Sequence, residues 1–259
     1  MIMGSPVTII TGAGSGIGRA TAELLAATGH RLVLFDRDKN GLSETREALV
    51  TEAEAITIAG DVSDEADVGE MIQKTEDHFG RLDAVVANAG INGVWAPIED
   101  LSPCEWDETI RINLRGTFLT LHKAVPLLKS AGGGAIVIVS SINGVRTFTN
   151  PGATAYSATK AAQVAMAQQL ALELGKHRIR ANVVCPGAVD TNIVAGSEIR
   201  NRAETEVPVI WPQGSIPLTD GRPGQAIDVA RVIRFLLSAE ASHMTGSPVF
   251  VDGGQGLLR

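Results

Sequence analysis

Short runs of apolar, mostly β-branched residues alternate along the chain with longer segments whose apolar residues recur at helical spacing. Most of the short runs are continuously apolar, which is typical of strands that are covered on both faces. We predict strands at residues 7–10, 32–35, 55–58, 84–86, 135–139, 180–184 and 248–251, and helices at 17–28, 39–52, 65–79, 103–130, 153–175 and 225–237.

This alternation of strand and helix predicts right-handed βαβ units within a single domain, residues 1–259. The expected fold class is α/β, with a doubly wound parallel sheet of about seven strands and helices on both faces. Such sheets bind ligands at the carboxyl ends of their strands, beside the point where the strand order reverses. Functional residues are therefore expected in the loops that lead from a strand into a helix.

Two of the predicted helices carry further information. Ser102-Pro103-Cys104-Glu105 has the pattern of a capping box with proline at the first helical position, so a helix begins at Pro103. The helix at 153–175 is apolar almost all round, and the face that does not lie on the sheet needs a second cover. A symmetry-related subunit, in a homodimer or homotetramer, is the favoured cover, and another segment of the same chain is the alternative.

Composition and charge disfavour several classes of function. The 22 Lys and Arg against 29 Asp and Glu give a net charge of −7 with no long basic stretch, which disfavours a nucleic-acid surface. The longest apolar run, 135–139, is too short to span a membrane, and the first residues do not resemble a secretory signal. Cys104 and Cys185 are far apart and the five histidines are scattered, so we expect no disulfide, no metal site and a soluble, cytoplasmic protein.

A glycine-rich turn follows the first predicted strand. It reads Thr11-Gly12-Ala13-Gly14-Ser15-Gly16-Ile17-Gly18 and leads into a helix, whose positive end and free N–H groups suit a pyrophosphate. It lacks the Gly-Lys-Ser/Thr of a nucleoside-triphosphate loop. The residues expected to approach the phosphates are Gly12, Ser15, Gly16, Ile17 and Gly18.

Asp36 ends the second predicted strand, 18 residues after Gly18. An acidic residue at about this place holds the ribose hydroxyls of a dinucleotide and would repel a 2′-phosphate. The sequence therefore favours NAD over NADP, although Arg37 can soften that repulsion.

The single tyrosine, Tyr156, is followed one helical turn later by Lys160, so the two side chains share a helix face. A free phenol has a pKa of about 10, and a neighbouring ammonium group lowers it toward the range of a useful base. A Tyr-x-x-x-Lys match alone is common by chance, so it predicts catalysis only together with other motifs.

Those other motifs lie at the ends of the predicted strands, in a fixed order. With the glycine turn, they make the whole chain resemble the short-chain dehydrogenase/reductase family, in its branch of 3-oxoacyl-acyl-carrier-protein reductases and alcohol dehydrogenases. The resemblance implies a Rossmann fold. The residues that carry it are Asp61-Val62, Ala87-Asn88-Ala89-Gly90, Asn113, Ser140-Ser141, Tyr156-Ser157-Ala158-Thr159-Lys160, Pro186-Gly187 and Val251-Asp252-Gly253-Gly254.

The resemblance implies a role for each of four catalytic residues. Tyr156 would be the general acid/base, and Ser141 would donate a hydrogen bond to the reacting oxygen. Lys160 would lower the pKa of Tyr156 and bind the nicotinamide ribose, and Asn113 would hold a water that links Lys160 to solvent. The further cofactor contacts that the resemblance implies are Asp61 and Val62 beside the adenine, Asn88, Ala89 and Gly90 along the groove, and Pro186, Gly187, Val189 and Thr191 at the carboxamide.

Three positions depart from the family pattern. Ala87 replaces an asparagine, and Arg19, after the glycine turn, is expected to be solvated and without a role. The interval from Ser141 to Tyr156 is two residues longer than usual, so the common spacing would land on Asn143, which has no hydroxyl. We prefer Ser141 because Gly144 follows it at the usual distance, and Ser140 stays as the alternative.

The substrate is expected to meet residues 188–223, 91–97 and 142–143. Trp95 is expected either as a wall of the substrate pocket or as a surface-packed side chain. Apolar residues on the long loop suggest a lid over a partly apolar pocket, namely Ile193, Val194, Val207, Val209, Ile210 and Trp211.

The motifs together predict an NAD-dependent oxidoreductase that interconverts a secondary alcohol and a ketone by hydride transfer. The alternative is a non-catalytic NAD(H)-binding regulatory protein. Enoyl reduction is disfavoured by the resemblance, because relatives with that activity space the tyrosine and lysine more widely.

Overall fold

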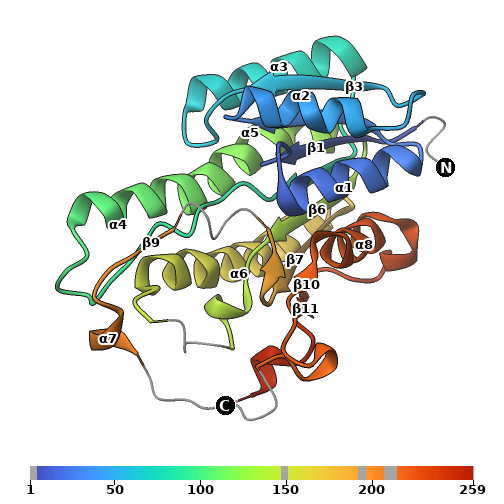
Figure 1. Ribbon diagram of the computed structural model, residues 1–259. Helices are drawn as coiled ribbons and strands as arrows, with labels where there is room; N and C mark the ends of the chain where they lie inside the picture. The colour runs from blue at the N-terminus through green and yellow to red at the C-terminus, as the bar shows by residue number, and fades with distance from the viewer. Residues whose placement is uncertain (1–4, 147–150, 192–196, 207–214, 259) are drawn as a thin grey trace.

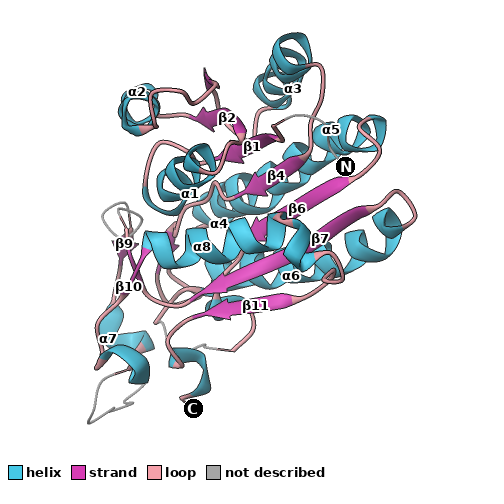
Figure 2. Ribbon diagram, turned by 90° about the vertical axis from the view of Figure 1, so that its right-hand side faces the viewer, coloured by secondary structure: helices cyan, strands magenta, loops and turns pink. Residues whose placement is uncertain are grey.

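The seven predicted strands form one parallel sheet in the computed structural model, which describes residues 5–146, 151–191, 197–206 and 215–258. Each strand pairs with its neighbours in parallel (Figures 1 and 2). In spatial order the strands are β3 (Ala55–Ala59), β2 (Arg31–Asp36), β1 (Val7–Thr11), β4 (Ala84–Ala87), β6 (Gly134–Val139), β7 (Ile179–Pro186) and β11 (Pro248–Val251).

Helices cover both faces of the sheet and enclose two apolar cores, as Figure 2 shows. Val7 and Ile9 of β1 belong to one core and Ile10 belongs to the other, because successive side chains of a strand point to opposite faces. This two-sided burial is why the strands are continuously apolar. One face carries α3 (Glu65–Phe79), α5 (Gly116–Ser130) and α6 (Thr154–Gly175), and the other carries α1 (Gly16–Ala27), α2 (Lys39–Ala48) and α8 (Ala226–Leu237).

The order of the strands reverses at β1. The chain runs outward from β1 through β2 to β3, then crosses to β4 on the opposite side of β1 and continues outward to β11. The carboxyl ends of β1 and β4 therefore flank the switch point, where a ligand crevice is expected. Among the described residues, no helix is long and apolar enough to cross a lipid bilayer.

The predicted helix at 103–130 is present, but it contains a π-helical turn. The capping box at Ser102 and Glu105 is present and starts α4 (Pro103–Ile110), which continues through the π-helical turn η1 (Arg111–Arg115) into α5. The predicted helix at 39–52 ends instead at Ala48, where the buried Leu49 takes an extended conformation.

The sequence pattern also missed several two-residue strands and a short helix. β5 (Val94–Trp95) pairs with β9 (Glu198–Ile199), and β8 (Val189–Asp190) pairs with β10 (Gly224–Gln225). The helix α7 (Arg202–Thr205) follows β9. The two small pairings attach parts of the expected substrate segment, 188–223, to the rest of the fold.

Candidate active site

The glycine turn between β1 and α1 brings backbone very close to backbone. Gly12 has φ +67°, and a Cβ there would lie 2.7 Å from Nδ2 of Asn88. A Cβ on Gly18 would overlap the Gly12 carbonyl oxygen. Ser15 makes no side-chain cap, and the first turn of α1 has no acidic residue, so the N–H groups there are available to an anion. This cradle fits a pyrophosphate.

Asn88 fastens the end of β4 to the glycine turn. Its Nδ2 donates to the carbonyl oxygens of Thr11 (3.0 Å) and Gly12 (3.2 Å). In return, Oγ1 of Thr11 accepts the backbone N–H groups of Asn88 and Ala89, each at 3.1 Å. These bonds hold the two strand ends beside the switch point in one fixed arrangement.

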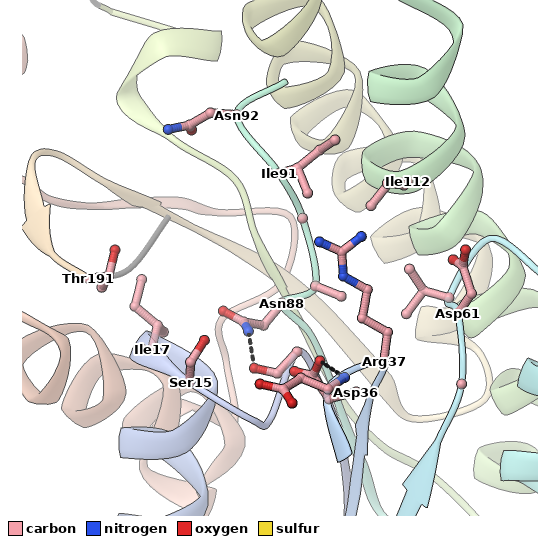
Figure 3. Close-up of a pocket in the computed structure, with 17 residues that line it drawn as sticks. Ser15, Ile17, Asp36, Arg37, Asp61, Asn88, Ile91, Asn92, Ile112 and Thr191 are labelled. Atoms are coloured by element: carbon pink, nitrogen blue, oxygen red, sulfur yellow. Dashed lines mark hydrogen bonds between the residues drawn. The ribbon is translucent and has the colours of Figure 1, made fainter. Parts of the chain in front are cut away.

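Asp36 places a carboxylate at the same crevice. Its Oδ2 accepts the Gly14 N–H at 2.9 Å and its Oδ1 accepts the Asp38 N–H at 3.0 Å. Figure 3 shows Arg37 extending from this point across the cavity toward Ile91 and Ile112. The crevice therefore has a negative group held by backbone donors and a cation reaching over it.

These residues line a cavity of about 350 Å³, a size that suits part of a small-molecule ligand. The predicted cofactor residues that line it are Gly12, Ser15, Gly16, Ile17, Asp36, Asp61, Val62, Asn88, Ala89, Gly90 and Thr191. Gly18, Tyr156, Lys160, Pro186, Gly187 and Val189 do not line it. Sequence reasoning missed Asp38, Gly60 and Ile112 as lining residues, although each is adjacent to a residue that it named.

Asp61 is held by its own neighbours. Its Oδ1 accepts from the N–H (2.8 Å) and the hydroxyl (2.6 Å) of Ser63, and its Oδ2 pairs with Nη1 of Arg111 at 3.0 Å. Partial burial would raise the pKa of Asp61, but the bonds from Ser63 and Arg111 outweigh it and lower this pKa below its usual value. The carboxylate of Asp61 therefore stays charged where it lines the cavity.

Arg19 was expected to be solvated and without a role, yet its side chain is only 31% exposed and makes several contacts. Its Nη2 donates to the Gly14 carbonyl at 2.6 Å and pairs with Glu44 at 2.7 Å, and its Nε donates to Thr45 Oγ1 at 3.1 Å. Arg19 therefore ties the glycine turn to α2. No sequence pattern indicated this, because strand β2 separates Arg19 from α2 along the chain.

The structure brings the predicted catalytic residues together next to the cavity. Nζ of Lys160 lies 5.5 Å from the centre of the Tyr156 ring, and a Cβ on Gly90 would lie 3.7 Å from that same nitrogen. Ser141 starts the turn η2 (Ile142–Gly144) at the end of β6, and its side chain hydrogen-bonds to Tyr156. The cluster thus adjoins the end of the cavity at which β4 ends.

The two neighbouring serines have different environments. Oγ of Ser140 is buried and donates to the Lys160 carbonyl at 2.7 Å, which ties β6 to α6. Oγ of Ser141 accepts the Asn143 N–H at 3.2 Å and also hydrogen-bonds to Tyr156, so it lies next to the predicted general acid/base. This geometry favours Ser141 over Ser140 as the donor to the reacting oxygen.

Asn113 lies in the π-helical turn and is completely buried. Its amide exchanges two hydrogen bonds with the backbone of Ile91, both at 2.8 Å, and donates to Oγ1 of Thr159 at 3.2 Å. The backbone carbonyl oxygen of Asn113 accepts from the hydroxyl of Thr117 (2.7 Å) and from Nε2 of Gln163 (2.9 Å). Asn113 therefore joins the loop after β4 to α6, and the water-binding role that the resemblance implies stays a prediction.

Comparison with known proteins agrees with this arrangement. A family model described as enoyl-(acyl carrier protein) reductase matches residues 12–255. A levodione reductase of Leifsonia aquatica is 38% identical over 253 residues, which cover 96% of this chain and 93% of the relative. The protein is a member of the short-chain dehydrogenase/reductase family.

Solved structures of this family superpose closely on the chain. A 3-ketoacyl-ACP reductase from Sinorhizobium meliloti 1021 is 62% identical, with a TM-score of 0.94, over 98% of this chain and all of the other chain. A 3-ketoacyl-(acyl-carrier-protein) reductase from Brucella melitensis, complexed with NADH, is 32% identical, with a TM-score of 0.85, over 98% and 99% of the two chains. This short-chain dehydrogenase/reductase is thus an enzyme that uses a nicotinamide cofactor to act on CH–OH groups.

Burial shifts the pKa values of the two central residues of this dehydrogenase/reductase. It raises the pKa of Tyr156 above its usual value, and the hydrogen bond from Ser141 offsets only part of this rise. Burial also lowers the pKa of Lys160 to about 8. Lys160 is therefore mostly charged at neutral pH, but it loses its proton at a lower pH than an exposed lysine does.

The loop after β7 is braced by the end of the chain. A Cβ on Gly187 would lie 2.7 Å from Oε1 of Gln255, and the same oxygen accepts the Ala188 N–H at 2.8 Å. The sequence had named Pro186, Gly187 and Val189 here but missed Gln255. Gln255 directly follows the Val251-Asp252-Gly253-Gly254 motif, and this position was the available signal in the sequence.

Proposed function

We propose that this enzyme uses NAD to interconvert a secondary alcohol and a ketone, with Tyr156 as the general acid/base. The single observation that carries the proposal is the grouping of Ser141, Tyr156 and Lys160 beside Gly90, which lines the cavity formed by the glycine turn and Asp36. The relatives reported above carry names of reductases, so they give no support to a non-catalytic regulatory protein.

In the proposed reaction the phenol of Tyr156 exchanges a proton with the substrate oxygen, while Ser141 donates a hydrogen bond to that oxygen. The bound nicotinamide supplies or accepts the hydride. The charge of Lys160 opposes the effect of burial on Tyr156, because a cation near a phenol stabilises its anion. Lys160 would also hold the nicotinamide ribose, and Asn113 would fix the loop that borders it.

A carbonyl substrate fits this grouping better than an enoyl substrate. The one-turn spacing of Tyr156 and Lys160 keeps the ammonium group 5.5 Å from the phenol ring, where it can support proton transfer to an oxygen. The names of the 3-ketoacyl reductases, which state a keto group, support the same reaction class.

The preference for NAD rests on Asp36. Its carboxylate faces the cavity on the bonds from Gly14 and Asp38, and a 2′-phosphate there would meet a like charge. The NADH bound in the Brucella melitensis reductase supports this choice. Among the described residues that line the cavity, Arg37 is the cation that would favour NADP, since its guanidinium group reaches into the same cavity (Figure 3).

The subunit contact that we propose uses the outer face of α6. Ala158, Ala161, Ala165 and Leu172 are exposed along this face, and the side chain of Leu172 is 81% exposed. Phe118 of α5 is also exposed. An apolar face of this kind supports a homodimer or homotetramer. The free thiols of Cys104 and Cys185 support a reducing compartment such as the cytoplasm.

The substrate would enter beside residues 188–223. The lid residues expected from the sequence, Ile193, Val194, Val207, Val209, Ile210 and Trp211, lie outside the described residues. Within the described part, Arg200 anchors the segment by pairing with Glu105 and by donating its N–H to the Trp95 carbonyl at 2.8 Å. We propose that this anchored segment and β5 form the substrate side of the site.

The proposed function is tested by mixing the purified protein with NADH and a panel of cyclic and open-chain ketones and following loss of NADH absorbance. Turnover with NADH at a higher kcat/KM than with NADPH is expected. Tight NADH binding without turnover of any ketone would contradict the proposal and would favour the regulatory alternative.

A further inference from the structure

Asn143 carries a buried amide nitrogen, Nδ2, that is unpaired within the described part of the chain. The residue lies in the turn η2, only 4% exposed, and its backbone N–H donates to Oγ of Ser141. Among the described residues its buried Nδ2 has no hydrogen-bond partner. A buried polar group without a partner destabilises a fold, so a turn built only for structure would carry an apolar side chain here.

The turn that carries Asn143 is fixed against the catalytic helix. A Cβ on Gly144 would lie 2.4 Å from the Ala161 nitrogen and 2.5 Å from the Lys160 carbonyl carbon, so glycine allows the turn to touch α6. Two residues before Asn143, the side chain of Ser141 hydrogen-bonds to Tyr156. The unused donor therefore belongs to the same rigid unit as the proposed reacting groups.

Trp95 supplies a flat apolar surface next to Tyr156. The two ring centres are 6.4 Å apart and the ring planes are tilted by 47°. Nε1 of Trp95 already donates to the Asn92 carbonyl at 3.1 Å, which leaves the ring faces for apolar contact. Strand β5, which carries Trp95, is fixed by its pairing with β9 and by the bond from Ala96 N–H to the Gly152 carbonyl.

Three cations on the described segments that carry or adjoin these residues already have partners in the protein. Arg200 pairs with Glu105 and Glu198, Nζ of Lys160 donates to the Val139 carbonyl at 2.9 Å, and Arg146 stacks on the Phe250 ring. The donor that remains on the same turn as Ser141 is therefore an uncharged amide. Such a donor suits a neutral oxygen, a carbonyl or a hydroxyl, better than a carboxylate or a phosphate.

We propose that Asn143 is a specificity-determining residue whose Nδ2 binds a second, neutral oxygen of the substrate, and that the substrate is a ring ketone lying against Trp95. The inference rests on the proposed ketone reduction and deepens it. A site that leaves a donor unpaired discriminates against a substrate that lacks the matching acceptor, because the donor's desolvation is then not compensated. The expected discrimination is about tenfold or more.

The test compares cyclohexanone with the cyclohexanedione whose carbonyls lie opposite one another, after correction for its two equivalent carbonyls. The natural protein should show a kcat/KM at least about tenfold higher for the dione. Asn143→Leu keeps the side-chain shape and removes the donor, so it should reduce this ratio to within about twofold by slowing the dione alone. The exposed neighbour Val145 gives a matched control, since Val145→Ala should leave the ratio unchanged.

Two further measurements keep this test separate from the proposed function. NADH affinity, followed by fluorescence, and the thermal unfolding midpoint of Asn143→Leu should equal or exceed those of the natural protein, because only an unpaired amide is lost. A destabilised Asn143→Leu, equal loss on both ketones, or no preference for the dione in the natural protein overturns the inference. A preference for a cyclohexanone that carries a carboxylate overturns it as well.

Activity on open-chain ketones without activity on either ring ketone overturns the inference and leaves the proposed function standing. Absence of turnover on every ketone overturns the proposed function itself.

Discussion

Nζ of Lys160 lies 5.5 Å from the centre of the Tyr156 ring, yet it donates its hydrogen bond to the Val139 carbonyl and not to the phenol. The lysine is 4% exposed, and burial lowers its pKa from 10.5 to about 8. The ammonium group is thus kept near the phenol at a cost in stability, and this cost can be measured.

Lys160→Met should stabilise the cofactor-free protein at about pH 7. In the folded state the pKa of Lys160 is lower than in the unfolded chain. The buried charge therefore lowers the free energy of unfolding by its full amount below about pH 8. This loss in free energy of unfolding becomes smaller as the pH rises from about 8 toward 10.5, because the unfolded chain then binds more protons than the folded protein. We expect the free energy of unfolding of Lys160→Met to exceed that of the natural protein by about 1–3 kcal/mol at neutral pH, and by less in alkaline solution.

Chemical denaturation of the two proteins across this pH range checks the prediction. Lys176→Met, at an exposed lysine just after α6, serves as the control and should change the free energy of unfolding by less than about 0.5 kcal/mol. If the free energies of unfolding of Lys160→Met and the natural protein differ by an amount that does not depend on pH, burial of the charge is not the cause of the difference.

Asp36 should set the preference between the two cofactors. Asp36→Ala removes the negative charge from the cavity and should lower the ratio of kcat/KM for NADH over NADPH by about tenfold or more. Asp36→Asn keeps an oxygen that can accept the Gly14 N–H, so it separates the effect of charge from that of loop support. Unchanged ratios in both variants would place the discrimination elsewhere, with Arg37 the first residue to substitute.

Arg19 should act on cofactor affinity through the glycine turn. Because it holds the Gly14 carbonyl at 2.6 Å, Arg19→Ala should weaken NADH binding by about threefold to tenfold and leave the preference between NADH and NADPH as it was. Glu44→Ala removes only the exposed ion pair and should change NADH affinity by less than about twofold. Fluorescence titration with NADH measures both, and equal effects of the two variants would refute a role for the bond to Gly14.

The exposed face of α6 should hold subunits together. Leu172→Glu places a charge on this face and should convert the assembly to a smaller species in analytical ultracentrifugation. Val50→Glu, at an exposed apolar position that follows α2 on the other side of the sheet, should leave the assembly unchanged. A monomeric natural protein, or an assembly that Leu172→Glu does not affect, would contradict the proposed contact.

The sequence was sufficient for the strands because burial on both faces leaves a continuous apolar run that needs no knowledge of distant residues. Strand β11, for example, has the predicted bounds 248–251, and β1 extends the prediction by one residue to Thr11. The glycine turn was equally predictable from the sequence, since the positive φ at Gly12 and the close approach at Gly18 exclude residues with a side chain.

Features that depend on contacts between remote segments were not predictable. The helix contains a π-helical turn at Asn113, whose amide bonds to Ile91 from a different loop. The pairing of Trp95 with Ile199 joins two-residue strands that have no periodicity to read. Asn143 drew attention in the sequence only as a poor substitute for the catalytic serine, because an unpaired amide becomes visible only once its surroundings are known.

The measurement that most directly tests the central claim is the turnover of Tyr156→Phe with NADH and a ketone that the natural protein reduces. Phenylalanine keeps the ring beside Trp95 and removes only the hydroxyl that exchanges the proton. We expect kcat to fall by about a hundredfold or more while the Kd for NADH changes by less than about twofold. A variant that retains most of its turnover would show that another group transfers the proton and would contradict the account.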